Sequence, residues 1–330
     1  LPLGEENPAE RDTLARRPQA HAPQLLPDVV EGATLPRGRS VALREHDATA
    51  AHGSPRPTIA PLDYERAGAA EYAALADALQ SSYGRYRAWD LWRQLREVQA
   101  IDGMFVLPRR LRFVTAECGG PGALYRPADA EVVLCYETLH TLYEHGQAQQ
   151  QALRQGDDYP LRYLRASVRF VVLHETGHAL VELLDLPVTG RQEDAVDQLA
   201  AILMLRFADG DETPAQVIDN LRMAANWLLS RSTGAYDLDA YADVHALGEQ
   251  RYFNLQCMIY GTDPAGFADM VDAHDLTPER AAGCEREMRQ AARAWLRLLM
   301  PHLAPGHEAY QKEAQRFLDG KGWVGPGRRS

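Results

Sequence analysis

The sequence predicts an α+β protein in which a small antiparallel sheet packs beside a predominantly helical bundle. Short stretches of alternating or β-branched apolar residues, typical of strands, occupy residues 110–117, 123–126 and 131–136. A turn cluster, Gly119-Gly120-Pro121-Gly122, separates the first two. Nearly all of the remaining ordered sequence shows apolar residues at helical spacing.

Helices are expected both before and after the strands along the chain. One precedes them, with an apolar face that includes Leu75, Leu79, Trp89 and Leu95. The others follow them and are separated by turn residues such as Gly156-Asp157. The predicted ranges are 64–101, 137–154, 161–184, 192–208, 214–231, 239–260, 264–273 and 278–300.

The two ends of the chain differ from its middle. Residues 1–62 contain nine of the 20 prolines and no sustained apolar periodicity, which predicts a disordered Pro/Ala-rich tail. A tail rich in Gly, Pro and Arg is expected over 321–330. One domain is therefore expected over residues 63–320.

The overall charge and the apolar runs exclude two classes of partner. The formal net charge of −11 argues against general nucleic-acid binding, which requires a basic face. No apolar run approaches the roughly 18 residues needed to cross a bilayer, so no transmembrane segment is expected. No signal peptide is visible in the chain.

The motif His174-Glu175-Thr176-Gly177-His178 carries the chemistry of a metal site. His174 and His178 are four residues apart, so on a helix both imidazoles share one face and can reach one ion. Zinc accepts neutral imidazole nitrogens well. Glu175 follows the first histidine and can take a proton from an activated water. Gly177 destabilises a helix by about 1 kcal/mol relative to Ala, which indicates a close approach of another segment there.

A following acidic helix offers the third ligand and its support. Glu193 and Asp197 are four residues apart, and a short loop after Leu186-Pro187 can fold this helix back over His178. We expect Glu193 to be the third ligand of one zinc ion. Asp197 is expected to accept the free ring N–H of a ligand histidine, His174 in the first place.

Other acidic residues compete for these roles. Asp194 lies on a different face from Asp197, and Glu182 lies four residues after His178 on the same helix. Glu193 itself could instead be a first-turn acid that complements the helix dipole.

The region after residue 239 supplies candidates for stabilising an oxyanion. His245 or Arg251 could do this, and a solvated helix face with a His245–Glu249 contact is the plainer interpretation. Tyr252 and Tyr260 are weaker candidates. The predicted strand from Glu131 to Tyr136 could border the cleft and bind an extended peptide, or it could be an ordinary inner strand.

Four cysteines allow three disulfide pairings or four free thiols. Cys118 and Cys135 lie at the ends of two predicted strands, and Cys257 and Cys284 lie on two neighbouring predicted helices. These local pairings favour two disulfides, Cys118–Cys135 and Cys257–Cys284, and therefore an extracytoplasmic (periplasmic or secreted) location.

Together these motifs resemble the gluzincin pattern of zinc peptidases. More closely, the chain resembles a family of bacterial metallopeptidases first catalogued as a domain of unknown function. Val196 departs from the pattern, because a small Ala is common there in gluzincins, and this affects packing rather than the ligands. The resemblance implies a zincin-like fold and a peptide or protein substrate. The stretches that carry it are His174–Leu183, Gly190–Gln198, Glu249–Asn254 with Cys257 and Tyr260-Gly261, Glu117–Gly119 and Leu134–Tyr136.

The sequence thus predicts a zinc metallopeptidase that hydrolyses peptide bonds with Glu175 as general base. Two alternatives remain open. The chain could be a catalytically weak binding or regulatory protein on the same scaffold, although the intact Glu175 argues against this. It could also be a metal-dependent hydrolase of a non-peptide amide. Oligomeric state and cleavage specificity are not predicted.

Overall fold

The computed structural model describes Val98, Ile101 and residues 103–116, 118–206, 212–232, 234, 238–273 and 275–321. All of these residues belong to one compact unit of the chain. The predicted tail over 1–62, most of the predicted helix over 64–101 and most of the predicted tail over 321–330 lie outside the described residues. None of the described helices is long and apolar enough to span a membrane.

Three strands form one mixed sheet: β1 (Arg112–Ala116), β2 (Ala123–Arg126) and β3 (Glu131–Cys135). Their order is β1-β3-β2, with β2 antiparallel and β1 parallel to β3. The prediction of a purely antiparallel sheet is therefore wrong. The short β2–β3 hairpin is antiparallel, but β1 and β2 flank β3 on opposite sides, which makes β1 parallel to β3.

The remainder of the described chain is almost entirely helical, which confirms the α+β class. Most predicted helices agree with the structure to within a few residues. In chain order the helices are α4 (Tyr136–Leu153), α5 (Tyr159–Leu183), α6 (Gln192–Arg206), α7 (Pro214–Ser230), α8 (Leu238–Ala242), α9 (Gly248–Tyr260), α10 (Asp269–Asp272), α11 (Pro278–Leu299), the 3-10 turn η5 (Met300–His302) and α12 (Glu308–Leu318).

The predicted helix over 239–260 is in fact two helices, α8 and α9, joined by residues 243–247. The side chain of Asp243 accepts a hydrogen bond from the backbone N–H of His245 at 2.7 Å, and such a local bond competes with helical pairing. Gln250 then accepts the N–H of Leu247 at 3.2 Å, so a new helix starts at Gly248. The predicted helix over 264–273 is shortened to α10, and α12 was not predicted.

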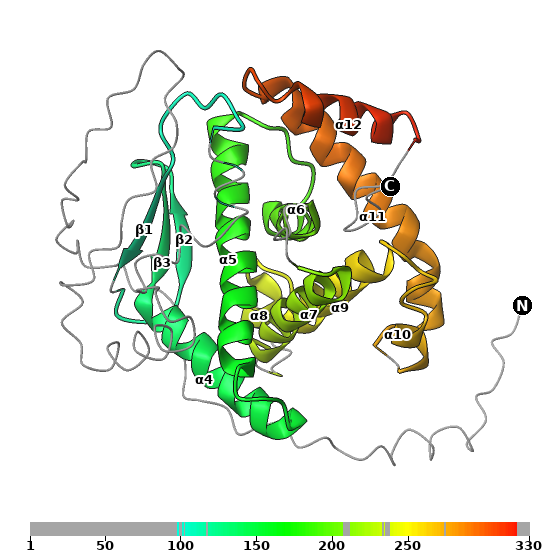
Figure 1. Cartoon of the computed structure of the whole chain (residues 1–330). Helices are drawn as coiled ribbons and strands as arrows, with labels where there is room; N and C mark the ends of the chain where they lie inside the picture. Colours follow the sequence, from blue (N-terminus) through cyan, green and yellow to red (C-terminus); the bar gives the residue numbers. More distant parts are fainter. Residues whose placement is uncertain are drawn as a thin grey trace, which may run out of the picture. The chain divides into compact units, whose positions relative to one another are not determined.

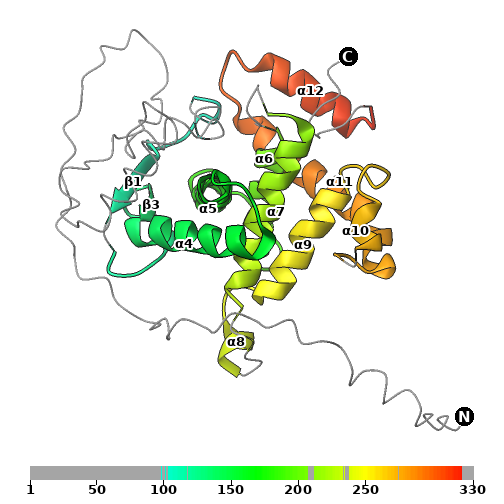
Figure 2. The ribbon, with the colours of Figure 1, turned by 60° about the horizontal axis from the view of Figure 1, so that its bottom comes forward.

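Helix α5 lies at the centre of this arrangement. It packs against α4 and the sheet on one flank and against α6 and α7 on the other (Figure 1). Figure 2 shows α5 nearly end-on among these neighbours. Most of its side chains are therefore buried, including Leu173, Thr176 and Ala179. A polar side chain on α5 meets water only where a neighbouring element leaves a gap.

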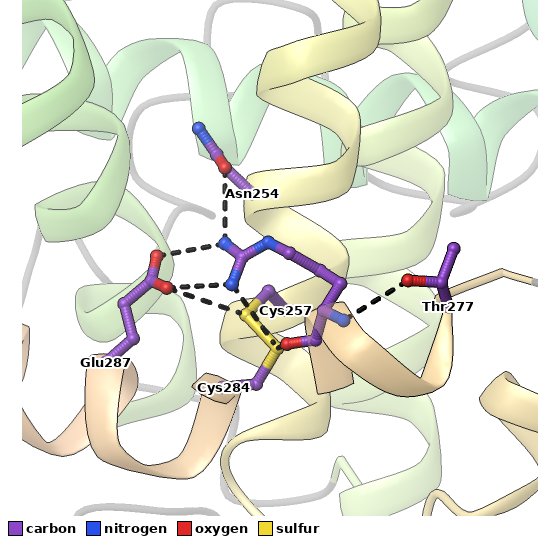
Figure 3. The surroundings of a disulfide bond; sticks show 6 residues. Asn254, Cys257, Thr277, Cys284 and Glu287 are labelled. Atoms are coloured by element: carbon purple, nitrogen blue, oxygen red, sulfur yellow. Dashed lines mark hydrogen bonds and ion pairs between the residues drawn. A yellow bond between two sulfur atoms is a disulfide. The ribbon is translucent and has the colours of Figure 1, made fainter. Parts of the chain in front are cut away.

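Both predicted disulfides are present, Cys118–Cys135 and Cys257–Cys284. The first fastens the turn after β1 to the end of β3. The second joins α9 to α11 (Figure 3). Beside it the guanidinium of Arg280 donates to the carboxylate of Glu287 at 2.8 and 3.0 Å. Arg280 also donates to Oδ1 of Asn254 on α9 at 3.3 Å, so the carboxyl-terminal half of α9 is anchored to α11 by the disulfide and by this hydrogen bond.

His145 on α4 makes a polar contact between α4, α5 and α7. Its Nε2 lies 3.2 Å from Oδ1 of Asn226, which also accepts the hydroxyl of Tyr163 at 2.9 Å. Burial lowers the pKa of His145, and the hydrogen bond to Asn226 opposes this less strongly. The unfolded chain, with an ordinary pKa near about 6.5, therefore binds more protons than the folded chain in mild acid.

We expect His145 to make the metal-free protein less stable in acid. The contribution of the neutral ring is complete above about pH 6.5 and is lost as the pH falls. A His145→Gln variant should therefore lose less unfolding free energy than the wild type between about pH 7.5 and about pH 5, measured by urea unfolding. His140→Gln on the same helix is the control; an unchanged slope for His145→Gln would contradict the expectation.

Candidate metal centre

Helix α5 brings the two histidines of the motif together. His174 and His178 are one turn apart, and their Nε2 atoms lie 3.2 Å from each other. Both rings are largely buried, with side-chain exposures of 6% and 15%. The helix is held in this place by the apolar neighbours on its flanks, so the two rings have little freedom to separate.

Helix α6 supplies the carboxylates that face these rings. Oε2 of Glu193 lies 3.0 Å from Nε2 of His174 and 3.3 Å from Nε2 of His178. Oδ1 of Asp197 lies 2.7 Å from Nδ1 of His174, on the other side of the ring. Glu193 and Asp197 thus contact the two nitrogens of the His174 ring, one each.

Gly177 explains how α5 and α6 come so close. A Cβ built on Gly177 would lie 2.8 Å from Cβ and 2.9 Å from Cγ1 of Val196, closer than side chains approach in proteins. The close approach expected from a glycine in the middle of this helix is therefore confirmed. Since Val196 stands between Glu193 and Asp197 on α6, this contact sets the distance from both carboxylates to the histidines.

A third histidine reaches the same carboxylate oxygen from the segment between α8 and α9. Nε2 of His245 lies 3.0 Å from Oε2 of Glu193, and its Nδ1 lies 3.1 Å from Oδ1 of Asp243. His245 therefore precedes α9 rather than lying on one helix face with Glu249, which accepts a hydrogen bond from Ser232. The His245 side chain is 43% exposed and stands at the solvent side of the cluster.

The hydrogen bonds of the three rings show what the cluster could hold. Each Nδ1 faces an oxygen that can only accept: a carboxylate oxygen of Asp197 or of Asp243, or the amide oxygen of Gln192, 2.7 Å from His178. Each Nδ1 therefore donates its proton, and in a neutral ring Nε2 keeps its lone pair. With neutral rings the three lone pairs would point toward one anionic oxygen, an arrangement that positive charge stabilises, either as a bound cation or as protons on the rings.

The spacing of these atoms fits a zinc ion. A tetrahedral site with zinc–nitrogen bonds of about 2.0–2.1 Å has ligand atoms about 3.3 Å apart. The three distances among His174, His178 and Glu193 are 3.0, 3.2 and 3.3 Å. His174, Glu193 and His245 also form a group whose ligand atoms all lie within 4.8 Å of one another. The residues present therefore fit a metal ion.

The pKa values of His174, Glu193 and Asp197 show that the carboxylates of the cluster stabilise positive charge on the rings. Burial alone would lower the pKa of His174, but hydrogen bonds with Asp197 and Glu193 outweigh it and raise the value to about 9. Burial would raise the pKa of Glu193, but the three histidines hold it far below its usual range. Burial also acts to raise the pKa of Asp197, which Arg251 and His174 lower to about 2. Both carboxylates are thus ionised.

Glu175 lies beside the cluster and is buried. Burial raises its pKa, whereas the charges of His174 and His178 act in the opposite direction. A backbone hydrogen bond from Tyr125 on β2 also reaches this carboxylate. Glu175 is therefore a buried carboxylate between the backbone of β2 and the histidines of the cluster.

The other predicted candidates lie elsewhere. The guanidinium of Arg251 is occupied by Asp197, and Glu182 is occupied by the Tyr125 hydroxyl at 2.6 Å and by Arg109 at 3.3 Å. Tyr252 bonds with Gln256. Asp194 does not belong to the groups of described residues that could hold a metal, and Tyr260 packs, partly buried, against the hydrophobic core.

Three contributors were missed in the sequence. Gln192 holds His178, Asp243 holds His245, and the backbone of Tyr125 contacts Glu175. Gln192 directly precedes Glu193, and an Asp two residues before a His is a common local turn, so both had a signal. The contact of Tyr125 depends on how the sheet packs and had none.

The second group of potential ligands, Cys118, Cys135 and Glu137, is explained by structure alone. Its two cysteines are joined in a disulfide. Glu137 accepts the backbone N–H groups of Cys118 and Gly119 at 3.0 and 2.7 Å. These contacts cap the turn after β1 and leave no thiolate for a metal.

The fold and the site together define an α+β protein that carries a buried cluster of histidines and carboxylates suited to a metal ion. A family described as "Putative metallopeptidase" matches residues 74–299, and the chain belongs to this family. The match covers the sheet, the cluster and helices α4 to α11 and ends before α12. No curated protein and no solved structure matches the chain significantly.

Proposed function

We propose that the chain is a zinc-dependent metallopeptidase whose single zinc ion is held by His174, His178 and Glu193. One observation carries the proposal. The lone pairs of two buried imidazoles converge with one carboxylate oxygen at 3.0–3.3 Å, and Glu175 lies next to them. Zinc is the ion that this ligand set favours, since it takes two His and one Glu in known hydrolytic sites.

The bound ion would lower the pKa of a water molecule and polarise the scissile carbonyl. Glu175 removes a proton from the attacking water as its oxygen bonds to the carbonyl carbon. Glu175 then delivers this proton to the leaving amine when the carbon–nitrogen bond breaks. The raised pKa of Glu175, due to burial, suits a group that must accept a proton and then release it.

The oxyanion that forms on the carbonyl requires a hydrogen-bond donor, and we assign this role to the protonated ring of His245, whose Nδ1–H stays on Asp243 and whose Nε2–H would donate. Its ring stands at the solvent side of the cluster, within 3.0 Å of Glu193. Arg251 was an equal candidate in the sequence. Its Nε and one terminal nitrogen donate to Asp197, which directs the guanidinium away from the proposed ligands, so we do not assign it this role.

The free edge of β2 is our candidate for binding an extended peptide. β3, which the sequence suggested, is the inner strand of the sheet and is paired on both sides. Among the strands that the structure describes, β2 pairs with β3 alone, and the backbone of Tyr125 on β2 reaches Glu175. A substrate chain along this edge would lie next to Glu175 and could use main-chain hydrogen bonds independent of side-chain identity.

The two disulfides support an extracytoplasmic location, because such bonds persist in oxidising compartments. The alternatives are a weakly active binding protein on the same scaffold and a hydrolase of a non-peptide amide. The weakly active binding protein conflicts with the presence of all three proposed ligands and of the proposed base, Glu175. The non-peptide hydrolase differs only in the substrate that the cleft accepts.

Metal content tests the ligand assignment. Wild-type protein should hold one equivalent of zinc by elemental analysis, and His174→Ala and Glu193→Ala should each lose most of it, since each removes a ligand. His140→Ala, at the surface of α4, is the control. One equivalent retained in both ligand variants would show that the site is misassigned. Wild-type protein that holds zinc but cleaves nothing in a peptide library would favour the binding protein.

A further inference from the structure

We propose that Arg251 is a positioning residue that fixes Asp197 and, through it, the orientation of the ligand ring of His174. This inference rests on the proposed metal site and assigns a function to a residue that touches neither the metal ligands' donor atoms nor a substrate. Arg251 lies on α9, a helix that contributes no proposed ligand. Its effect would reach the metal only through Asp197.

The contact between Arg251 and Asp197 is bidentate. Nε of Arg251 donates to Oδ2 of Asp197 at 2.7 Å, and NH2 donates to Oδ1 at 2.8 Å. Two parallel bonds fix the plane of the carboxylate as well as its position. A single bond, such as a lysine could make, would leave the carboxylate free to rotate about its Cβ–Cγ bond.

Oδ1 of Asp197 is shared between Arg251 and the ring of His174. It accepts the Nδ1–H of His174 at 2.7 Å while it accepts from Arg251. Both partners of the ion pair are nearly buried, with side-chain exposures of 11% and 16%. Water therefore competes little for Oδ1, and the direction of the His174 ring depends on this one oxygen.

Arg251 can act as a fixed support because α9 is itself held at both ends. At its start, a Cβ built on Gly248 would lie 2.6 Å from the carbonyl oxygen of Leu228, so α9 abuts the backbone of α7. Toward its end, Cys257 is bonded to Cys284 on α11 (Figure 3). The register of α9 against α6 and α7 is thus set independently of the metal site.

The plainer interpretation is an ion pair that only stabilises the fold. The chain offers a comparison that separates the two: Arg280 also binds a carboxylate with two bonds, at 2.8 and 3.0 Å, and its partner Glu287 lies on the same helix, α11. Glu287 contacts no proposed ligand of the metal. Loss of Arg280 should therefore affect stability without affecting the metal.

The test measures zinc affinity by chelator competition and the visible absorption of cobalt-substituted protein. Removing support behind a ligand histidine weakens metal binding by about 10- to 100-fold in known sites. We expect this loss, with an altered cobalt spectrum, for Arg251→Gln, a smaller loss for Arg251→Lys, and no change for Arg280→Gln. In an Asp197→Asn background, Arg251→Gln should cause little further loss, because the group it orients is already altered.

Thermal unfolding of the metal-free variants checks that each one folds. Equal zinc affinity and an unchanged cobalt spectrum in Arg251→Gln would overturn the proposal. So would a loss in Arg280→Gln as large as that in Arg251→Gln, since it would show a general effect of stability. Failure of the proposed function is a separate result: in that case the wild-type protein itself would bind neither zinc nor cobalt.

Discussion

A Glu175→Gln protein is expected to bind zinc as the wild type does and to cleave peptides about 10²- to 10⁴-fold more slowly, the usual contribution of a general base. The amide has nearly the same shape as the carboxylate but cannot accept the proton of the attacking water. Glu175 follows His174 in the chain, yet its carboxylate is held by the backbone of Tyr125 rather than by the ligand set. Metal binding should therefore be independent of this change.

The measurement is initial cleavage rate on a peptide pool, with zinc content determined on the same samples. Glu144→Gln, on the exposed side of α4, serves as the control for removing a carboxylate. Cleavage at the wild-type rate by Glu175→Gln would remove Glu175 from the mechanism. Loss of zinc together with activity would instead assign Glu175 to the metal site.

Gly177→Ala is expected to weaken zinc binding and stability together, and Val196→Ala is expected to restore both. The added methyl group would meet Val196 at 2.8 Å, so α6 must move away from α5. Overpacking of this kind costs about 1–3 kcal/mol. Alanine has a higher helix propensity than glycine, which stabilises α5 by about 1 kcal/mol. The net loss of unfolding free energy is therefore smaller than the cost of overpacking. The displacement carries Glu193 away from both histidines, which affects the metal more than the fold.

A double-mutant cycle checks this coupling. Unfolding free energy and zinc affinity are measured for Gly177→Ala, Val196→Ala and the double variant. The interaction term between the two changes should favour the double variant by about 1 kcal/mol or more, because the residues are in contact. Additive effects would mean that Val196 on α6 is not in contact with residue 177 in solution. A Gly177→Ala protein with wild-type zinc affinity would show that α6 can shift without moving Glu193.

Local patterns predicted most of the described helices between residues 136 and 299, and they placed His174, His178 and Glu193 on two successive helices. His174 and His178 need only helical geometry, and Glu193 needs only a short return loop. The disulfides followed from the same coarse layout. Gly177 also indicated a close neighbour. Glycine destabilises the interior of a helix, so its presence there suggests that another segment leaves no room for a side chain.

Contacts between distant segments were beyond the sequence patterns. The parallel pairing of β1 with β3 depends on which side of β3 the chain crosses, and alternation of apolar residues carries no information about that choice. The break at Asp243 was hidden by continuous helical spacing, and it changes His245 from a helix residue to a loop residue. The sequence offered Arg251 only as a candidate for the oxyanion role, because Asp197, the partner that defines its proposed positioning role, lies on another helix.

The separation of the proposed ligands along the chain implies an order in which they come together during folding. His174 and His178 are in place once a single helix has formed, and loop closure to Glu193 spans few residues. His245 lies some 70 residues from His174, beyond α7, and Arg251 lies beyond it, so both join only after distant helices have packed. A refolding chain is thus expected to bring together the two histidines first, then Glu193 with Asp197, and last His245 and Arg251. Zinc added early in refolding would meet a partial site, and zinc added late would meet the finished one.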